Sequence, residues 1–241
     1  MEKLCLLLGQ YEGDNLWRND ATIYCSGTGG PQGLLNISPA WFQQGHEVIS
    51  LSMKNLIIGS QFSIKTVQES PQVGKTIKSP EGLKWLDSVS QSNSILSAIL
   101  AVIHPNLHTA DQKTFKRLRE CSKIDDPHGV LSQWTSAFNG VSIIFNHLTP
   151  AHQDGKSQNQ WYDLLVTLGH YRNCNLELPG LGLSLEYGPG TVVGLMGSAL
   201  EHEVSHFEGE RVCYAYFMRD SVHEWAGVPE STWMKTSHHY Q

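Results

Sequence analysis

The sequence has few cysteines, and none stands at the spacing of a metal site. Only five occur among its 241 residues, and their number is odd. They are far apart along the chain, and no Cys-x-x-Cys pair is present. This pattern excludes a disulfide-stabilised secreted fold and a zinc ribbon, so we expect a reduced, intracellular protein.

Long apolar runs and a surplus of positive charge are also missing. No stretch reaches the ~20 apolar residues of a membrane span, so we expect no membrane partner. The net charge is −6, from 17 basic and 23 acidic residues, and bulk electrostatics therefore do not favour nucleic acid. A local basic surface would still be sufficient. The chain has no internal repeats and no low-complexity segments.

Length and composition favour one large unit with a substantial core. Hydrophobic residues make up 40% of the chain, which is enough to fill a core. The character of the sequence changes near residue 130. We expect residues 1–130 to supply supporting strands and helices, and residues 131–241 to form a β-rich catalytic core.

The N-terminal part predicts strands within residues 47–64 and then helices. Apolar residues recur at helical spacing from residue 82 to 103, with a polar interruption near Ser90–Asn93, which predicts two helices. A third helix is expected over residues 109–121, capped by Thr109 or Asp111. One face of that helix is basic. Such a face is usually solvated, but contact with a phosphate backbone is the alternative. The basic residues are Lys113, Lys116, Arg117 and Arg119.

The C-terminal part is broken into short β-type segments by Gly and Pro. Strands are expected at 141–145, 163–168, 176–179, 183–187, 191–196, 199–204 and 211–218. Several short strands at intervals of 8–12 residues favour a β-sandwich or jelly roll over a parallel α/β sheet.

A His-x-Asp pair at His152 and Asp154 is followed by a distant histidine and an arginine. Two histidines and one carboxylate can bind one face of Fe(II) and leave positions open for a co-substrate and oxygen. We expect His202 as the third ligand, with His206 as the alternative. Arg211 would bind a carboxylate in a bidentate manner, which predicts 2-oxoglutarate as co-substrate.

Longer motifs surround these residues, and with them the C-terminal hundred residues resemble the fungal branch of the TET/JBP family. That family comprises nucleic-acid oxygenases that depend on Fe(II) and 2-oxoglutarate. The motifs begin at Thr149 (TPAHQD), Trp161 (WYDLLVTLG), Leu178 (LPGLG), Tyr187 (YGPGTVVGL), Leu200 (LEHEV) and Gly209 (GERVCYAYFMRDSVH). The resemblance implies an α+β fold, a double-stranded β-helix (jelly roll, cupin-like) with N-terminal helices packed on one sheet.

The resemblance also assigns roles to individual positions. His152, Asp154 and His202 match the iron ligands, and Arg211 matches the 2-oxoglutarate arginine. Cys213 stands where many relatives have a second co-substrate contact.

Other positions correspond to the base pocket or depart from the family pattern. Phe217 matches an aromatic residue that stacks on the target base. Arg219 replaces a histidine that hydrogen-bonds the base, and His147 replaces an arginine near the co-substrate. Asn146 is a polar group within reach of co-substrate or base, or an ordinary strand end. Tyr162 and Asp163 either line the pocket or belong to the core.

The expected activity is oxidation of the methyl group of 5-methylcytosine in double-stranded DNA, after base flipping, to 5-hydroxymethyl-, 5-formyl- and 5-carboxylcytosine. The cofactors would be Fe(II) and 2-oxoglutarate, assisted by ascorbate, with O2 as oxidant. Demethylation of 6-methyladenine or of an RNA base is the alternative, and an inactive binding domain is a third. We expect a monomer, and a nuclear location on the strength of the substrate alone.

Overall fold

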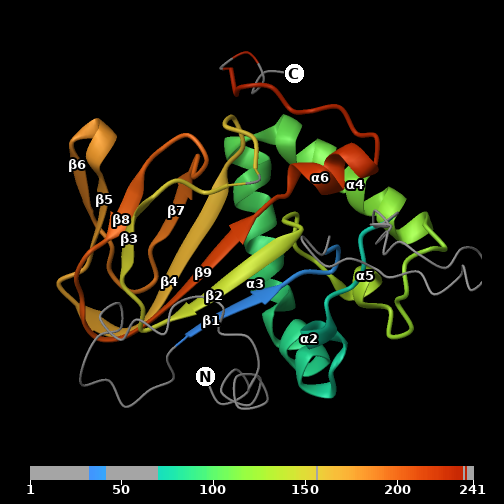
Figure 1. The fold of residues 1–241 in the computed structure, drawn as a ribbon, viewed down its shortest axis with the longest axis horizontal. Helices are drawn as coiled ribbons and strands as arrows, with labels where there is room; N and C mark the ends of the chain where they lie inside the picture. The colour runs from blue at the N-terminus through green and yellow to red at the C-terminus, as the bar shows by residue number, and fades with distance from the viewer. Residues whose placement is uncertain (1–32, 42–69, 156, 236, 238–241) are drawn as a thin grey trace, which may run out of the picture.

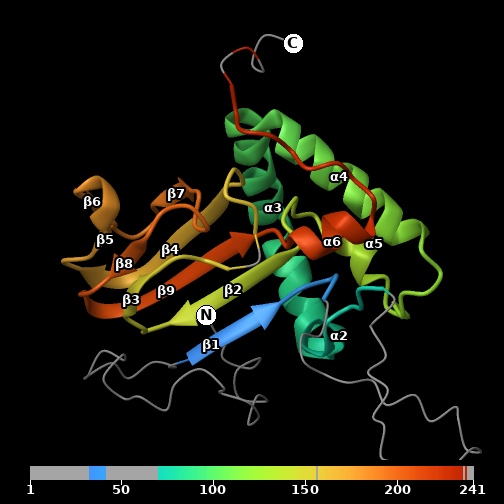
Figure 2. The ribbon, with the colours of Figure 1, turned by 45° about the horizontal axis from the view of Figure 1, so that its top comes forward.

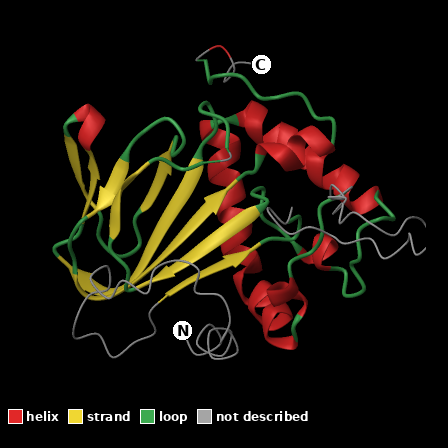
Figure 3. Ribbon diagram, in the orientation of Figure 1, coloured by secondary structure: helices red, strands yellow, loops and turns green. Residues whose placement is uncertain are grey.

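Two antiparallel sheets face each other, and helices cover the outer side of the larger one (Figures 1 and 3). The computed structural model describes residues 33–41, 70–155, 157–235 and 237. The larger sheet has the order β1 (Gly33–Ile37), β2 (Gly140–Phe145), β9 (Glu208–Phe217), β4 (Asp163–Arg172) and β7 (Val192–Leu195). The smaller sheet has the order β3 (Thr149–His152), β8 (His202–Val204), β5 (Asn175–Leu178) and β6 (Leu183–Glu186).

The eight strands from β2 to β9 form a double-stranded β-helix. Along the chain they pass between the two sheets so that β2 pairs with β9, β9 with β4, β3 with β8, and β8 with β5. This is the jelly-roll arrangement. The fold expected from the sequence, α+β with N-terminal helices on one sheet, is confirmed.

The helices precede and follow the strands. They are α2 (Lys75–Lys78), α3 (Pro80–Ile103), α4 (Pro105–Glu120), α5 (Val130–Gln133) and α6 (Asp220–Trp225), with a 3-10 turn, η2 (Pro179–Leu181), between β5 and β6. Helix α3 crosses the outer face of the larger sheet (Figure 2). Its buried residues Trp85, Leu86, Leu96 and Leu100 join one core cluster with side chains of β1, β2, β4 and β9.

Strand alternation separates this helix-facing core from a second core between the sheets. In β9, Val212 and Tyr216 belong to the cluster under α3, whereas Cys213 belongs to the cluster between the sheets. Successive side chains of a strand point to opposite faces. The odd-numbered residues of β9 therefore face the space between the sheets.

The predicted break near Ser90–Asn93 is wrong, because α3 is one continuous helix. Asn93 is fully buried, and its Oδ1 accepts a hydrogen bond from the hydroxyl of Tyr216 at 2.8 Å. The polar residue that suggested a helix end is instead a polar contact with the sheet.

The predicted start of the next helix is also wrong. Helix α4 begins at Pro105, and the side chain of His104 caps it by accepting a hydrogen bond from the Leu107 amide. Proline suits the first turn, where its missing N–H costs nothing. Asp111, proposed as a cap, is fully buried inside the helix.

Among the described residues, α3 is the one helix with the length and composition to cross a membrane. The expectation that no segment reaches this threshold is therefore wrong. A core helix passes the same test, and one face of α3 packs on the larger sheet. Its outward face exposes Ile95 and Val102.

Two of the four basic residues of α4 serve the fold itself. Arg117 donates a hydrogen bond to the carbonyl of Ala226, and Arg119 donates to the carbonyls of Leu131 and Trp134. These contacts connect α4 to α5 and α6, so the basic face is not simply a solvated or a phosphate-binding surface.

The N-terminal segment contributes to the same sheet as the catalytic strands. Strand β1 pairs with β2 along its whole length, from Gly33 opposite Phe145 to Ile37 opposite Val141. The strands predicted within 47–64 lie outside the described residues. The division at residue 130 into a supporting part and a catalytic part stays a prediction.

Candidate active site

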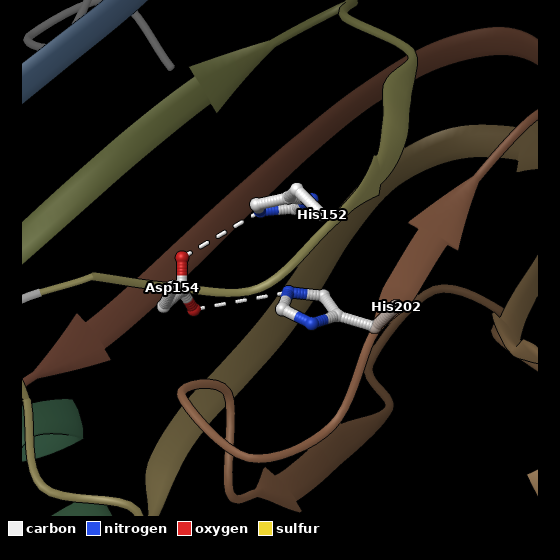
Figure 4. A group of neighbouring side chains, drawn as sticks. All are labelled: His152, Asp154 and His202. Atoms are coloured by element: carbon white, nitrogen blue, oxygen red, sulfur yellow. Dashed lines mark ion pairs between the residues drawn. The ribbon is translucent and has the colours of Figure 1, made fainter. Parts of the chain in front are cut away.

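His152, Asp154 and His202 meet at one end of the space between the sheets (Figure 4). His152 ends β3, His202 begins β8, and the two residues are opposite each other in the pairing of these strands. Asp154 Oδ1 lies 3.5 Å from His152 Nε2, and Asp154 Oδ2 lies 3.8 Å from His202 Nε2. The three ligand atoms lie within 4.8 Å of one another, as a shared metal ion requires.

Both histidines are oriented by the same local contact. His152 Nδ1 lies 2.9 Å from the carbonyl oxygen of Pro150, and His202 Nδ1 lies 3.0 Å from that of Leu200. A carbonyl accepts only from a protonated nitrogen, so each Nδ1 carries a hydrogen, and Nε2 is the nitrogen of each ring that can bind a metal once it is deprotonated. This arrangement is typical of metal-binding histidines. The donor set fits Fe(II).

Gly197 provides the space for the acidic side of the site. Its carbonyl oxygen accepts a hydrogen bond from the Asp154 amide at 2.9 Å. A Cβ atom at this position would collide with the carboxylate of Asp154 and would lie 2.7 Å from that of Asp163. Only glycine therefore lets both carboxylates lie against this backbone.

The charges of the site are unevenly distributed. A hydrogen bond to Asp154 raises the pKa of His152, whereas burial lowers the pKa of His202. Burial opposes ionisation of Asp154, but its His152 hydrogen bond and the nearby cations hold the pKa of this carboxyl below its ordinary value. Burial, and then the Asp154 carboxylate, raise the pKa of Asp163 well above its usual range.

Arg211 is a buried cation deeper between the sheets. Its Nε donates to the Thr167 hydroxyl at 3.1 Å, and its guanidinium lies over the rings of Tyr187 and Phe207. Within the described part of the chain, no carboxylate forms an ion pair with it. A buried guanidinium without an acidic partner fits the distal carboxylate of 2-oxoglutarate.

Asn146 holds the backbone of this arginine. Its amide donates to the Arg211 carbonyl and its Oδ1 accepts from the Arg211 amide, both at 2.8 Å. The residue adopts a φ of 48°, a left-handed conformation that asparagine tolerates better than most residues. Asn146 thus positions Arg211 and is not among the residues that line the cavity.

One cavity of about 420 Å³ joins these groups. Its size is within the usual range of ligand pockets. It brings together most of the residues singled out in the sequence, namely His147, His152, Asp154, Asp163, His202, Arg211, Cys213, Phe217 and Arg219. In β9, Arg211, Cys213 and Phe217 share the inward face because they are separated by even numbers of residues.

Besides Asn146, two candidate residues lie outside the cavity. Tyr162 does not line the cavity. Its ring contacts that of His104, with centroids 5.9 Å apart, and belongs to the periphery of the helix-facing core. His206, the alternative ligand, is exposed and lies 3.7 Å from Glu208, outside the metal cluster.

Comparison with known proteins identifies the class of this site. A family model described as Tet_JBP, the oxygenase domain of the 2OGFeDO superfamily, matches residues 63–220. The chain belongs to the Tet_JBP family. It is therefore an oxygenase that depends on Fe(II) and 2-oxoglutarate, and the donor set and the buried arginine fit both groups. The more specific assignment to the fungal branch stays a prediction.

Searches for individual relatives give weaker matches. No curated protein sequence matches significantly. Thirty-one solved chains match. One, "NgTET1 in complex with 5mC DNA", is 16% identical, with a TM-score of 0.47, over 70% of this chain and 62% of that chain. Another, a Cupin 2 conserved barrel domain protein from Salinispora arenicola, is 13% identical, with a TM-score of 0.24, over 36% and 69%. The chain spans less than two thirds of NgTET1.

Two residues of this site were not predicted from the sequence. Gly197 carries no chemistry of its own, and Trp41, which lines the cavity, precedes the matched region. The sequence offers one signal for Gly197, which is its place in Met196-Gly197-Ser198, five residues before the candidate ligand His202. A lone glycine after a strand, however, usually indicates only a turn. Nothing near Trp41 in the sequence connects it to residues more than one hundred positions away.

Proposed function

We propose that this oxygenase oxidises the methyl group of 5-methylcytosine in double-stranded DNA to 5-hydroxymethyl-, 5-formyl- and 5-carboxylcytosine. The observation that carries the proposal is the single cavity that joins the metal triad, the buried Arg211 and the partly exposed aromatic ring of Phe217. Such a chamber holds a co-substrate at its charged end and a planar group at its aromatic end. The methylated-base chemistry itself rests on the TET/JBP motifs.

Each residue has a defined task in this proposal. His152, Asp154 and His202 would hold the iron, and Arg211 would fix the distal carboxylate of 2-oxoglutarate, with Cys213 beside it. When bound, Fe(II) with 2-oxoglutarate and O2 supplies the oxidising power that inserts oxygen into a C–H bond. One oxygen atom goes to the methyl carbon and the other to succinate, while one carboxyl group leaves as carbon dioxide.

The base must leave the helix to reach this chamber, because its methyl group is enclosed by neighbouring bases in a duplex. Phe217 replaces part of the lost stacking, a contribution of about 1–3 kcal/mol for a base on an aromatic ring. The cavity also offers Asp163 as an acceptor for an exocyclic amino group. Its Oδ1 is buried and has no hydrogen-bond partner among the described residues.

Further features belong to the same proposal. We infer methylated DNA as the macromolecular partner, a monomeric state, ascorbate as an aid in keeping the iron reduced, and a nuclear location that follows from the substrate. We also infer that no membrane partner takes part, and one face of α3 packs on the larger sheet.

Substrate-stimulated succinate formation tests the proposed function. Purified protein with Fe(II) and 2-oxoglutarate would be given duplexes containing 5-methylcytosine, 6-methyladenine or neither. We expect stimulation only by 5-methylcytosine. Stimulation by 6-methyladenine, with release of formaldehyde, would show instead that the enzyme oxidises N-methyl groups. Binding of DNA without any succinate would support a non-catalytic binding domain instead.

A further inference from the structure

A buried polar cluster joins α4, α6 and the segment that leads into β4. It consists of Asp111 and Thr114 on α4, His223 on α6, and Trp161, all almost fully buried. The imidazole of His223 lies between the other side chains. Its Nε2 is 3.5 Å from Asp111 Oδ1, its Nδ1 is 3.4 Å from Thr114 Oγ1, and its ring centre is 4.7 Å from that of Trp161. The active-site cavity is lined by other residues, so the chemistry described above leaves this cluster unused.

Thr114 determines which nitrogen of His223 carries a hydrogen. The Thr114 hydroxyl donates its single hydrogen to the Ala110 carbonyl at 3.1 Å, so it can only accept from the imidazole. Nδ1 of His223 is therefore protonated. A neutral imidazole has only one N–H, so Nε2 of a neutral ring would face Asp111 with a lone pair.

One further proton must therefore lie between Asp111 and His223. An ionised carboxylate opposite an unprotonated Nε2 would bring two acceptors together with no hydrogen between them. Either the acid form of Asp111 donates to Nε2, or a charged imidazole donates to the carboxylate, and the pair holds the same proton in both forms. Asp111 Oδ2 has no hydrogen-bond partner among the described residues. An ionised Asp111 without this proton would thus be a poorly compensated buried charge.

The cluster connects two segments that are distant in the chain. Helix α6 packs on α4, and His223 lies within α6 (Figures 1 and 2). Trp161 ends the turn that leads into β4, and its amide donates to the carbonyl of Gln158. Gln158 Nε2 donates to Asp220 Oδ2, at the start of α6, over 3.4 Å. Both segments are therefore connected to each other, and to α4 through Asp111.

The same two segments continue to the metal site. Asp163 is two residues after Trp161, and Arg219 directly precedes α6, and both residues line the cavity. Their charges and that of the candidate metal ligand Asp154 act on one another. A change in the buried cluster can therefore reach Asp154 through the residues beside it.

We propose that the proton shared by Asp111 and His223 fixes both segments to α4 and so positions the acidic side of the metal site. In the described part of the chain, neither residue bonds to a candidate metal ligand, so both are positioning residues that act through Trp161 and the start of α6. The inference concerns metal binding and does not depend on which base is oxidised.

This connection should weaken as the pH rises, because the shared proton is then lost. Burial raises the pKa of Asp111 to about 6, whereas the charged groups that act on it, His223 and Arg119, oppose this shift. Below that pH the proton is in place. Above it, an ionised Asp111 faces an unprotonated Nε2, and α6 is held less firmly against α4.

The test compares iron binding by wild type and Asp111→Asn at pH 5.5 and 7.5. The amide of asparagine can donate to Nε2 at both pH values, so the variant keeps the contact without titrating. Anaerobic titration with Fe(II) gives the affinities, and their ratio cancels the titration of the metal ligands themselves. The two proteins should bind iron alike at pH 5.5. At pH 7.5 wild type should bind it about 2- to 30-fold more weakly than the variant, the usual range of coupling through packed side chains.

Asp125→Asn, which removes an exposed carboxylate, is the matched control and should bind iron like wild type at both pH values. A purely structural role of Asp111 would change the unfolding temperature but leave the iron affinities of the folded proteins in a constant ratio. A constant ratio therefore overturns the inference. Absence of iron binding by wild type would overturn the metal site and this inference together.

Nitrogen NMR of His223 in the iron-free protein tests the proton directly and needs no turnover. Nδ1 should carry a hydrogen in wild type and in Asp111→Asn. Between pH 5.5 and 7.5, the Nε2 signal should shift in wild type only. A ring without hydrogen on Nδ1, or the same pH response in both proteins, would overturn the shared proton.

Discussion

Single residues determine whether the metal site can form, and some of them are not ligands. At Gly197, two carboxylates lie in the space that a side chain would occupy. His152 and His202 each expose Nε2 because Nδ1 is bound to a carbonyl two residues earlier. The site is therefore built mainly by local backbone geometry around three short segments.

Gly197→Ala should weaken iron binding by about 10- to 100-fold, the usual cost of disturbing a residue that orients a metal ligand. The added methyl group displaces the Asp154 carboxylate with which it collides. Anaerobic titration with Fe(II) measures the effect. Gly180→Ala is the control, because a Cβ there meets nothing within 4 Å. Equal iron affinity in both variants would show that the carboxylate does not need this space.

Arg211→Lys should raise the KM for 2-oxoglutarate by about 10- to 100-fold. An ammonium lacks the planar fork that binds a carboxylate with two hydrogen bonds, and it cannot also reach the Thr167 hydroxyl as Nε does. Initial rates at varied 2-oxoglutarate give the KM. Arg172→Lys, on the surface, should leave it unchanged. A normal KM in Arg211→Lys would refute the role of Arg211 in co-substrate binding.

The ligands were predictable at this scale because His-x-Asp is a local motif with its own chemistry. The roles of Asn146, Gly197 and Trp41 were not, since each depends on a contact with a residue far away in the chain. Asn146 illustrates this well. The sequence places a polar group near the site, but only the pairing of β2 with β9 shows that it binds the Arg211 backbone.

At the scale of elements, a buried ionisable pair connects α4 with α6. Asp111 and His223 are both almost fully buried, and His223 Nε2 lies 3.5 Å from Asp111 Oδ1. The ring of Trp161, just before β4, packs on His223 with a centroid distance of 4.7 Å. The pair therefore joins two helices to the start of a catalytic strand.

Asp111 should make the stability of the iron-free protein depend on pH. Burial raises the pKa of Asp111 from 3.8 to about 6. The folded state favours the protonated form of Asp111. This contribution to the free energy of unfolding is therefore fully present at pH values below the pKa of Asp111 in the unfolded chain, and it is lost as the pH rises to about 6. The loss is about 3 kcal/mol. Denaturant unfolding of wild type and Asp111→Asn at pH 4 to 7 measures it.

Asp111→Asn should lack the pH-dependent contribution of Asp111. The free energy of unfolding of the variant should therefore increase relative to that of wild type as the pH rises. Asp125→Asn removes an exposed carboxylate and should run parallel to wild type. Parallel curves for Asp111→Asn and wild type would contradict the assignment.

Element boundaries were predicted well for strands and less well for helices. Alternation and turn residues locate β4 to β9, although β6 is exposed along its whole length and β8 begins three residues later than expected. The helix errors at Asn93 and Asp111 have one cause. Both are polar residues that a local rule assigns to a break or a cap. In the fold, a hydroxyl 123 residues away donates to Asn93 Oδ1, and a histidine 112 residues away faces Asp111.

For the whole molecule, the site is formed where both sheets and the N-terminal segment meet. The three candidate metal ligands come from the end of β3, the loop after it and the start of β8, whereas β9 supplies Arg211 and Phe217. Trp41 lines the same cavity from outside the jelly roll. The jelly roll was predictable from strand spacing and family motifs. The pairing of β1 with β2 was not, because more than one hundred residues separate the two strands.

Iron and 2-oxoglutarate should stabilise the whole fold, because a site formed by separate strands binds ligands only when folded. At concentrations of 100 times Kd, each ligand adds about 2.7 kcal/mol. For a chain of this size, that corresponds to a rise in Tm of about 5–10 °C. Anaerobic thermal unfolding should show the rise, and a chelator should reverse it. The rise should be absent in His152→Ala, and an equal rise there would place the metal elsewhere.

Nucleoside mass spectrometry tests the central claim most directly. Wild type and His152→Ala would be incubated with Fe(II), 2-oxoglutarate and duplexes carrying 5-methylcytosine or 6-methyladenine, and the digested nucleosides quantified. We expect 5-hydroxymethyl-, 5-formyl- or 5-carboxylcytosine with wild type only. Loss of 6-methyladenine with unchanged 5-methylcytosine, or no change in either base, would contradict the proposed function.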